Sequence, residues 1–328
     1  MGGSNSLPPF GHALSGSAGA LIALALTYPL DIIKTRMQVQ SGALLKKSNR
    51  AFVEDEDLVP EYTSMWHAFQ SILGNEGIEG LYAGLPAGLL GTASSNFAYF
   101  FWYQTIREYH ARRATGPTST AVELALGALA GALSQLTTIP VSVVITRQQT
   151  TPKARRMTFS ETWMSIVREE GVTALWKGLK PSMVLVSNPA ITFGMFERLK
   201  TLVVGKQAGR PLSSGEVFVI GAMAKTLATV VTYPYIMAKV RLQWKPPKEH
   251  AHNPELQFKS AMDVLRKVLK AEGLVGWYKG MQPQILKAVL SQALLFVLKD
   301  KIDKYTLVAF MLVRGASAGS SVVVQRNR

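Results

Sequence analysis

Two lysines interrupt apolar stretches of the sequence, and an ammonium group is a natural partner for an anion. Lys287 precedes AVLSQALLFVL, and Lys225 lies in GAMAKTLAT, nine residues before Pro234. If these stretches cross a membrane, both lysines are functional candidates, because a charge inside the bilayer is costly. Lys287 could instead extend to the interface, and Lys225 could bind a carbonyl group of a neighbouring helix. The chemistry indicated is the binding of an anionic solute.

The elements that must position these lysines belong to an internal repeat. TYPLDIIKTR, TIPVSVVITR and TYPYIMAKVR each place a proline at the end of an apolar run, with an arginine seven residues later. A second motif follows each one and reads EGIEGLYAG, EGVTALWKG and EGLVGWYKG, at 76–84, 170–178 and 272–280. Two motifs in one order, three times over, predict three repeats of about 100 residues. We divide the chain into repeats at 1–110, 111–205 and 206–310, and a tail at 311–328 that we expect to be disordered.

The composition indicates a membrane protein rather than a nucleic-acid-binding protein. Of the 328 residues, 48% are hydrophobic and only 17% charged, while the net charge is +15. The basic residues lie between apolar runs and do not form one RNA-reading module, so headgroups or an anionic solute suit them better. The chain has no cysteine, which excludes disulfides, thiolate metal sites and a cysteine nucleophile. We expect no metal, no cofactor and no enzymatic activity.

A membrane-spanning helix needs roughly 20 mostly apolar residues, and six segments qualify. We place them at 10–38, 83–107, 121–148, 180–200, 214–242 and 281–302. The long connections contain apolar residues at helical spacing at 62–77, 159–171 and 258–273, which predicts amphipathic helices on the membrane surface. The sequence therefore predicts an all-α membrane protein with two spans and one surface helix in each repeat.

The prolines of the first motif should bend three of these spans. Pro29, Pro140 and Pro234 each free a carbonyl group, which is tolerable where the helix borders a protein-lined cavity. Three kinked helices at matching depth would converge and close one end of a central cavity.

The symmetry of the repeats also indicates where a solute would bind. Counting seven residues from the last glycine of each second motif gives Gly91, Leu185 and Lys287: a gap, an apolar surface and a cation. Such a set suits a phosphate-bearing molecule with a flat ring, in which Lys287 attracts phosphate, Gly91 leaves room, and Val184 with Leu185 packs against the base. Asn188 could add hydrogen bonds, although polar packing between helices explains it almost as well.

These motifs resemble those of the mitochondrial carrier family over essentially the whole chain. The family signature is P-x-[DE]-x-x-[KR]-x-[KR], followed by an amphipathic helix and [DE]-G-x-x-x-x-aromatic-[KR]-G, three times. TYPYIMAKVRLQ, SNPAITFGMFE and KAVLSQALLFVLKDK are most similar to the peroxisomal branch, which moves adenine nucleotides or related cofactors. The resemblance implies six helices around a solute path, alternating access, exchange transport and a peroxisomal membrane location, with the mitochondrial inner membrane as the alternative.

The sequence departs from that signature at the residues that close one gate. In the family, the acid of one repeat pairs with the first base of the next, yet only the first repeat has both, as Asp31 and Lys34. The second has Ser142 and Ile145, and the third keeps only Lys239, so no inter-repeat ion pair is complete. Glutamines match the family's brace in all three repeats, at Gln38, Gln149 and Gln243. We therefore expect hydrogen bonds and apolar contacts to hold this gate.

The opposite gate, on the second span of each repeat, matches the family only in part. Phe196 and Glu197 begin a complete element, whereas Gln104 and Lys299 replace the acid in the other repeats. Glu197 could pair with Lys299 or Arg107, or simply lie at a solvated helix end.

Three functional hypotheses follow from these residues and the resemblance. The first is an exchanger importing ATP against AMP or ADP, the second a carrier of CoA, FAD or NAD, and the third a scaffold or ion leak built on the carrier fold. The expected partners are an adenine nucleotide and membrane lipids, with no nucleic acid, and the protein should be a monomer. Basic clusters at 153–156 and 245–248 could contact peroxisomal import factors or anionic lipid.

Overall fold

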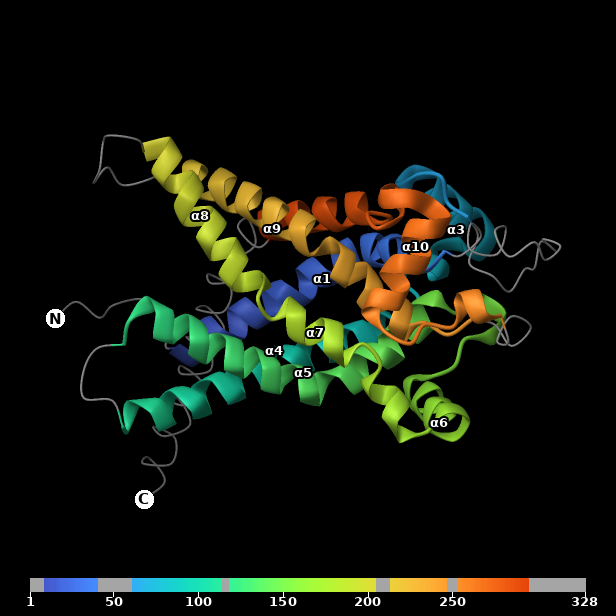
Figure 1. Ribbon diagram of the computed structural model, residues 1–328, viewed down its shortest axis with the longest axis horizontal. Helices are drawn as coiled ribbons and strands as arrows, with labels where there is room; N and C mark the ends of the chain where they lie inside the picture. The colour runs from blue at the N-terminus through green and yellow to red at the C-terminus, as the bar shows by residue number, and fades with distance from the viewer. Residues whose placement is uncertain (1–8, 41–60, 114–117, 205–212, 247–252, 295–328) are drawn as a thin grey trace, which may run out of the picture. The chain divides into compact units, whose positions relative to one another are not determined.

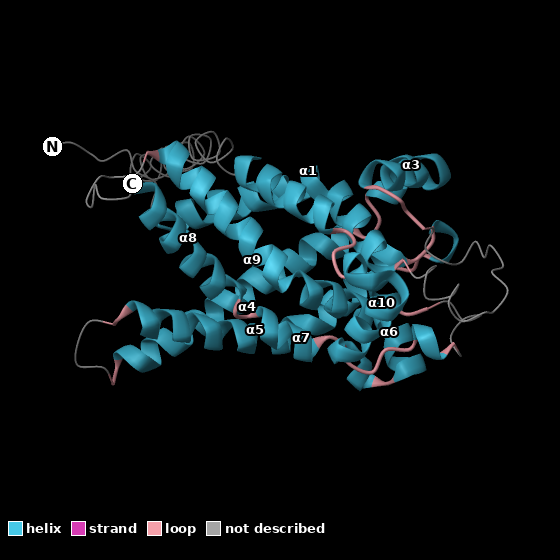
Figure 2. Cartoon of the chain, turned by 45° about the horizontal axis from the view of Figure 1, so that its top comes forward, coloured by secondary structure: helices cyan, strands magenta, loops and turns pink. Residues whose placement is uncertain are grey.

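The structure is a computed structural model that describes residues 9–40, 61–113, 118–204, 213–246 and 253–294 (Figure 1). Within these ranges all regular structure is helical (Figure 2). The predicted all-α class is confirmed. Lys299 and the tail at 311–328 lie outside the described residues.

Long helices occupy the positions of the predicted spans. The bounds are α1 (Pro9–Val39), α4 (Leu85–Ala111), α5 (Thr120–Thr150), α8 (Asn188–Val204) and α9 (Ser214–Gln243), and a further helix covers 281–294. By length and composition, Thr120–Thr150 and Gly215–Gln243 are apolar enough to cross a membrane, although no more than two helices of the described part pass that test.

The predicted span at 180–200 is wrong as a single helix. It consists of α7 (Leu179–Leu185) and α8, which begins at Asn188. Pro189 disfavours a helical conformation for the residue before it, and Ser187 turns back to donate its hydroxyl to the carbonyl of Val184 at 2.7 Å. The chain therefore breaks its helix in the middle of this span.

The chain divides into two compact units, 1–28 with 287–328, and 29–286. In the described part of the first unit, the hydroxyl oxygens of Thr27 on α1 and Ser291 on the last helix lie 3.4 Å apart. The second unit contains every predicted site residue except Lys287 and Lys299.

Within the second unit, α4 packs along α5 and α8 packs along α9 (Figure 1). In the second and third repeats, an amphipathic helix packs on the part of α5 or α9 that follows the proline. In the second repeat, Val143 and Val144 of α5 pack on Ile166 of α6 (Phe159–Glu170). In the third, Met237 of α9 packs on Val264 of α10 (Ala261–Gly276). The predicted surface helices are thus present, with α3 (Met65–Leu81) as the first.

The first and the last glycine of the second motif have positive φ angles in every repeat. Each amphipathic helix is capped at its start by a serine or threonine, at Ser64, Thr158 and Ser260. It is interrupted at the glycine of Glu-Gly, where φ is 70°, 84° and 68° in turn, and the final glycines have φ of 72°, 86° and 79°. Glycine adopts such angles without steric cost. The two glycines therefore allow the backbone to turn from the surface helix into the next span.

Candidate functional site

A ring of arginines joins the ends of α1, α5 and α9 within the second unit. Each arginine that lies seven residues after a proline donates its Nε–H to the carbonyl oxygen of the glutamine in the next repeat. The distances are 3.2 Å from Arg36 to Gln149, 3.0 Å from Arg147 to Gln243 and 2.7 Å from Arg241 to Gln38. Last-turn carbonyl groups of a helix lack partners within it. The ring supplies those partners and connects the three repeats cyclically.

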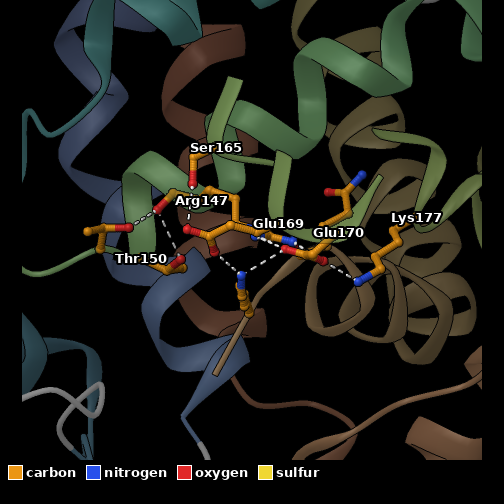
Figure 3. Close-up of polar contacts among 9 residues, drawn as sticks. Arg147, Thr150, Ser165, Glu169, Glu170 and Lys177 are labelled. Atoms are coloured by element: carbon orange, nitrogen blue, oxygen red, sulfur yellow. Dashed lines mark hydrogen bonds and ion pairs between the residues drawn. The ribbon is translucent and has the colours of Figure 1, made fainter. Parts of the chain in front are cut away.

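The same arginines bind the glutamate that ends the amphipathic helix of their own repeat. Arg36 holds Glu76 at 2.5 and 2.9 Å, Arg147 holds Glu170 at 2.6 and 3.0 Å (Figure 3), and Arg241 holds Glu272 at 3.3 Å. Bidentate arginine–carboxylate pairs are among the stronger polar contacts. Each arginine thus ties its surface helix to its own span and to the neighbouring repeat.

Glu170 shows the electrostatic result most clearly. Burial opposes its charge, but the hydrogen bonds and charges of Arg147 and Lys177 outweigh that effect and lower the pKa of the carboxyl group from 4.5 to about 2. Lys177 lies 2.5 Å from Glu170 (Figure 3). Glu76 behaves alike, since burial opposes its charge while Arg36 and Arg156 lower its pKa. Both glutamates are therefore charged at neutral pH.

Cations that follow α5 and α9 reach back to the preceding repeat. Lys245 lies 2.6 Å from Glu169 and 3.3 Å from Glu170, both on α6. Arg156 binds Glu76, and Lys153 lies 2.9 Å from Glu79, both on α3. Some members of the basic clusters proposed for import factors are thus engaged in ion pairs between repeats.

The predicted glutamine brace is present as hydrogen bonds between repeats. Gln149 accepts a hydrogen bond from Thr35 at 2.9 Å, and Gln243 accepts one from Thr146 at 3.0 Å. The third repeat has a valine at the position of these threonines. Its place is taken by Tyr233, whose hydroxyl accepts from Gln38 at 2.9 Å and donates to the carbonyl of Lys279.

The ion-pair positions of the predicted gate lie among these glutamines. Lys34 binds Asp31 in the same helix, at 3.2 Å. Ser142, at the position of the missing acid, exchanges hydrogen bonds with Gln243 at 3.3 to 3.4 Å. The absence of an acid from the second repeat thus leaves Lys239 without the partner that the family pattern would provide.

Close backbone approach near the brace depends on the final glycines of the second motif. A Cβ atom on Gly280 would lie 2.9 Å from the carbonyl oxygen of Lys34 and 3.1 Å from Gln38. One on Gly178 would lie 3.2 Å from Gln243 and 3.4 Å from Lys239. Glycine at these two positions therefore allows each of these repeats to pack closely against the gate residues of the next repeat.

The structure brings together two of the predicted substrate-binding residues, Asn188 and Lys225. Lys225 on α9 donates to the amide oxygen of Asn188 on α8 at 3.0 Å, and the Asn188 amide nitrogen donates to Thr232 at 2.7 Å. Four residues before Asn188, the side chain of Val184 is 46% exposed, and Leu185 is partly buried. A cation, an amide and an apolar surface therefore meet near the break between α7 and α8.

Gly91 packs against a neighbouring helix in this structure, whereas we expected it to leave room for a solute. Gly91 is buried, and a Cβ atom there would collide with the Cδ1 atom of Ile145 on α5. The missing side chain accommodates a neighbouring helix, and the space is not left for a solute. Ile145 occupies the place of a basic gate residue, and its apolar side chain makes this contact.

The other expected residues are placed as follows. Lys287 is partly buried in the helix 281–294 of the first unit. Glu197 pairs with Lys200 at 3.6 Å on its own helix, while Arg107 pairs with Glu123 at 3.6 Å. The pairing of Glu197 with Arg107 is thus not formed in this structure and stays a prediction, and Lys299 lies outside the described residues.

The prolines lie inside continuous helices, as Pro29 in α1, Pro140 in α5 and Pro234 in α9. Proline lacks the N–H that would bind the carbonyl four residues earlier. At Pro140 that carbonyl belongs to Leu136, and it accepts a hydrogen bond from the indole N–H of Trp176 at 2.9 Å. Trp176 of the second motif thus supplies the hydrogen bond that Pro140 of the first motif cannot donate to this carbonyl.

Sequence reasoning missed the arginine ring and the roles of Trp176 and Tyr233. A signal existed for the ring, because one arginine and one glutamate recur in register in all three repeats. No signal could have shown that the arginines also bind main-chain carbonyl groups. In the described part of the chain, no group of three or more His, Asp or Glu side chains could hold a metal ion.

Comparison with known proteins shows which family the chain resembles. The family model described as mitochondrial carrier protein matches residues 5–113, 116–207 and 210–308. A mitochondrial substrate carrier family protein Q of Dictyostelium discoideum is 36% identical, over 91% of this chain and 89% of its own length.

Two further relatives are named for peroxisomes. A peroxisomal nicotinamide adenine dinucleotide carrier of Arabidopsis thaliana is 32% identical, over 89% of this chain and 95% of its own length. A peroxisomal adenine nucleotide transporter 1 of Saccharomyces cerevisiae is 35% identical, over 89% of this chain and 90% of its own length. The predicted multi-pass carrier fold and peroxisomal membrane location agree with these relatives.

Proposed function

Because the chain belongs to the mitochondrial carrier family, we propose that it exchanges adenine nucleotides across the peroxisomal membrane, taking ATP in one direction and AMP or ADP in the other, by alternating access. The arginine ring supports the alternating-access part of this proposal, and the relatives named as adenine nucleotide and nicotinamide adenine dinucleotide carriers support the choice of solute. The ring joins three symmetry-related helices at one end through hydrogen bonds to neutral acceptors. Such hydrogen bonds can stabilise a closed state and still break when the carrier opens, since each hydrogen bond to a charged group contributes a net free energy of only about 1.5–3 kcal/mol.

The solute would bind where the span of the second repeat breaks. Lys225 would attract phosphate and Asn188 would offer its amide, while Val184 and Leu185 would pack against the base. The Lys225–Asn188–Thr232 chain links α8 of the second repeat to α9 of the third. A solute that took Lys225 from Asn188 would therefore loosen a contact between repeats, which is the coupling that alternating access needs. Lys287, which belongs to the other unit, is proposed separately as a phosphate-binding cation.

A carrier of larger adenine-containing cofactors is the second candidate. The observation that favours it is the Arabidopsis relative named as a nicotinamide adenine dinucleotide carrier, which is nearly as similar as the yeast adenine nucleotide transporter. Both solutes contain adenine and phosphate, so cations and an apolar surface suit either. The difference must lie in the space around the base and the second nucleotide.

Exchange in liposomes tests the proposal. Purified protein would be reconstituted with internal unlabelled ATP, and uptake of external labelled ATP would be measured against AMP, ADP, CoA, FAD, NAD and a pyrimidine nucleotide. We expect AMP and ADP to compete, and Lys287→Ala and Lys225→Gln to reduce uptake, with exposed Lys180→Gln as the control. Competition led by CoA, FAD or NAD would transfer the assignment to the cofactor carrier. Uptake that ignored every competitor and both lysines would indicate a leak or scaffold instead.

The brace itself can be tested by changing Gln38, Gln149 and Gln243 together to alanine. The variant loses the side-chain hydrogen bonds to Thr35, Thr146 and Tyr233 but keeps the main-chain carbonyls that the arginines bind. We expect the closed state to be weakened but not abolished, which would appear as altered exchange rates at unchanged solute selectivity. Exchange rates equal to those of the wild type would refute the role of the brace.

A further inference from the structure

The gate positions of this chain carry more positive than negative charge. They are the residues two and five positions after each proline: Asp31 and Lys34, Ser142 and Ile145, Ile236 and Lys239. One carboxylate therefore faces two ammonium groups. Charges buried in a membrane protein are costly unless a partner compensates them.

The single carboxylate is already used. Asp31 binds Lys34 at 3.2 Å, and the Ser142 hydroxyl is occupied by Gln243. Among the described residues of 29–286, the ammonium group of Lys239 makes no hydrogen bond or ion pair, and the residue is partly buried. Lys34 lies on α1, and the end of α1 is joined to the end of α9 by the hydrogen bond from Arg241 to the Gln38 carbonyl oxygen at 2.7 Å.

The surroundings hold the Lys239 side chain in place without neutralising it. Its Cγ atom would lie 3.4 Å from a Cβ atom on Gly178, so the absent side chain of that glycine leaves room for the lysine stem. Lys34 and Lys239 occupy the same position in their repeats, four residues before Gln38 and Gln243. Both lysines therefore lie one helical turn before a glutamine of the brace.

We propose that Lys239 and Lys34 form an anion-binding site that takes the phosphate chain of the transported solute. The bound phosphate replaces the acid that the second repeat lacks and is the counter-ion of the gate. This assignment rests on the proposed function for the identity of the solute, and it adds a place where phosphate is bound directly beside the barrier. A solute with more phosphate groups then binds more tightly because it reaches both cations.

The test uses binding to the purified full-length protein, with AMP, ADP, ATP and inorganic tripolyphosphate as probes. Lys239→Gln should weaken binding of ATP and tripolyphosphate by about tenfold, the usual effect of one charged hydrogen bond, and weaken AMP less. Lys239→Arg should restore most of the affinity. Ser142→Asp should also weaken ATP, because it offers Lys239 an internal carboxylate. Lys180→Gln controls for the loss of one positive charge.

The possible failures are distinguishable. If Lys239→Gln and Ser142→Asp bind ATP and tripolyphosphate as the wild type does, the anion site is overturned, even where nucleotide exchange is intact. If tripolyphosphate binds and depends on Lys239 while adenine nucleotides are not exchanged, the anion site stands and the proposed solute falls. A variant that fails to fold is recognised by the absence of a thermal unfolding transition. In that case, ATP binding by Lys239→Arg and Ser142→Asp decides whether the anion site exists.

Discussion

Glu170 offers a direct measure of how strongly the surface helices are tied to the spans. Glu170→Gln keeps the shape of the side chain but removes the charge held by Arg147 and Lys177. The fall of its pKa from 4.5 to about 2, at about 1.4 kcal/mol for each pKa unit, corresponds to about 3 kcal/mol of folding free energy at neutral pH. The side chain is 14% exposed and its partner Arg147 is 9% exposed, so solvent screens the pair little.

Thermal unfolding of the purified protein would reveal this loss. We expect the midpoint of Glu170→Gln to fall by roughly 6–12 °C, since 1 kcal/mol corresponds to about 2–4 °C in larger domains. The matched control is Glu169→Gln, because the neighbouring glutamate is 41% exposed and binds Lys245 at the surface. Exposed ion pairs contribute about 1 kcal/mol or less, so the control should change little.

The pH dependence supplies a second check. The pKa of Glu170 is lower in the folded protein, so its contribution to stability is complete above pH 4.5 and is lost as the pH falls toward 2. The difference in stability between wild type and Glu170→Gln should therefore be constant near neutral pH and shrink below pH 4.5. Equal midpoints for Glu170→Gln and Glu169→Gln at pH 7 would refute the reasoning.

Two further substitutions test the backbone devices of the motifs. Trp176→Phe keeps the ring but leaves the carbonyl of Leu136 without its donor, so we expect a loss of about 1–3 kcal/mol in unfolding free energy; a stability equal to wild type would mean that Pro140 needs no such repair. Gly280→Ala should abolish exchange, because its Cβ atom would lie 2.9 Å from the carbonyl oxygen of Lys34. Gly171→Ala carries a similar positive φ but has open space around it, so it should lose stability and keep exchange; equal exchange by both variants would contradict the steric argument.

Much of the fold follows from the sequence because the motifs act locally. The Glu-Gly dipeptide, the final glycine and the apolar periodicity each determine a turn or a helix face over a few residues. The three repeats therefore reinforce one another, and the surface helices and most of the long helices were predicted correctly. The break between α7 and α8 was missed because Ser187 and Pro189 interrupt a stretch whose composition is otherwise that of one span.

The site was less predictable because its contacts depend on which residues neighbouring repeats present to each other. Glutamines were expected at the gate, but Tyr233 as a partner of Gln38 depends on the valine that replaces threonine in the third repeat. Gly91 was expected to leave a gap for the solute, whereas the neighbouring helix fills it with Ile145. Pairing across repeats is decided by side-chain reach and helix approach, and neither can be obtained from spacing along one chain.

The arginine ring has a consequence for how this protein tolerates mutation. A side-chain acceptor vanishes when its residue is replaced, but a main-chain carbonyl is present whatever residue occupies the position. Substitutions at the three glutamines therefore cannot remove the acceptors of Arg36, Arg147 and Arg241. Mutation can therefore remove the donors of the ring but not its acceptors. Replacing any one arginine would remove contacts in two repeats at once, because each arginine binds the glutamate of its own repeat and a carbonyl oxygen of the next. The ring's acceptors also do not depend on the acids that the second and third repeats lack.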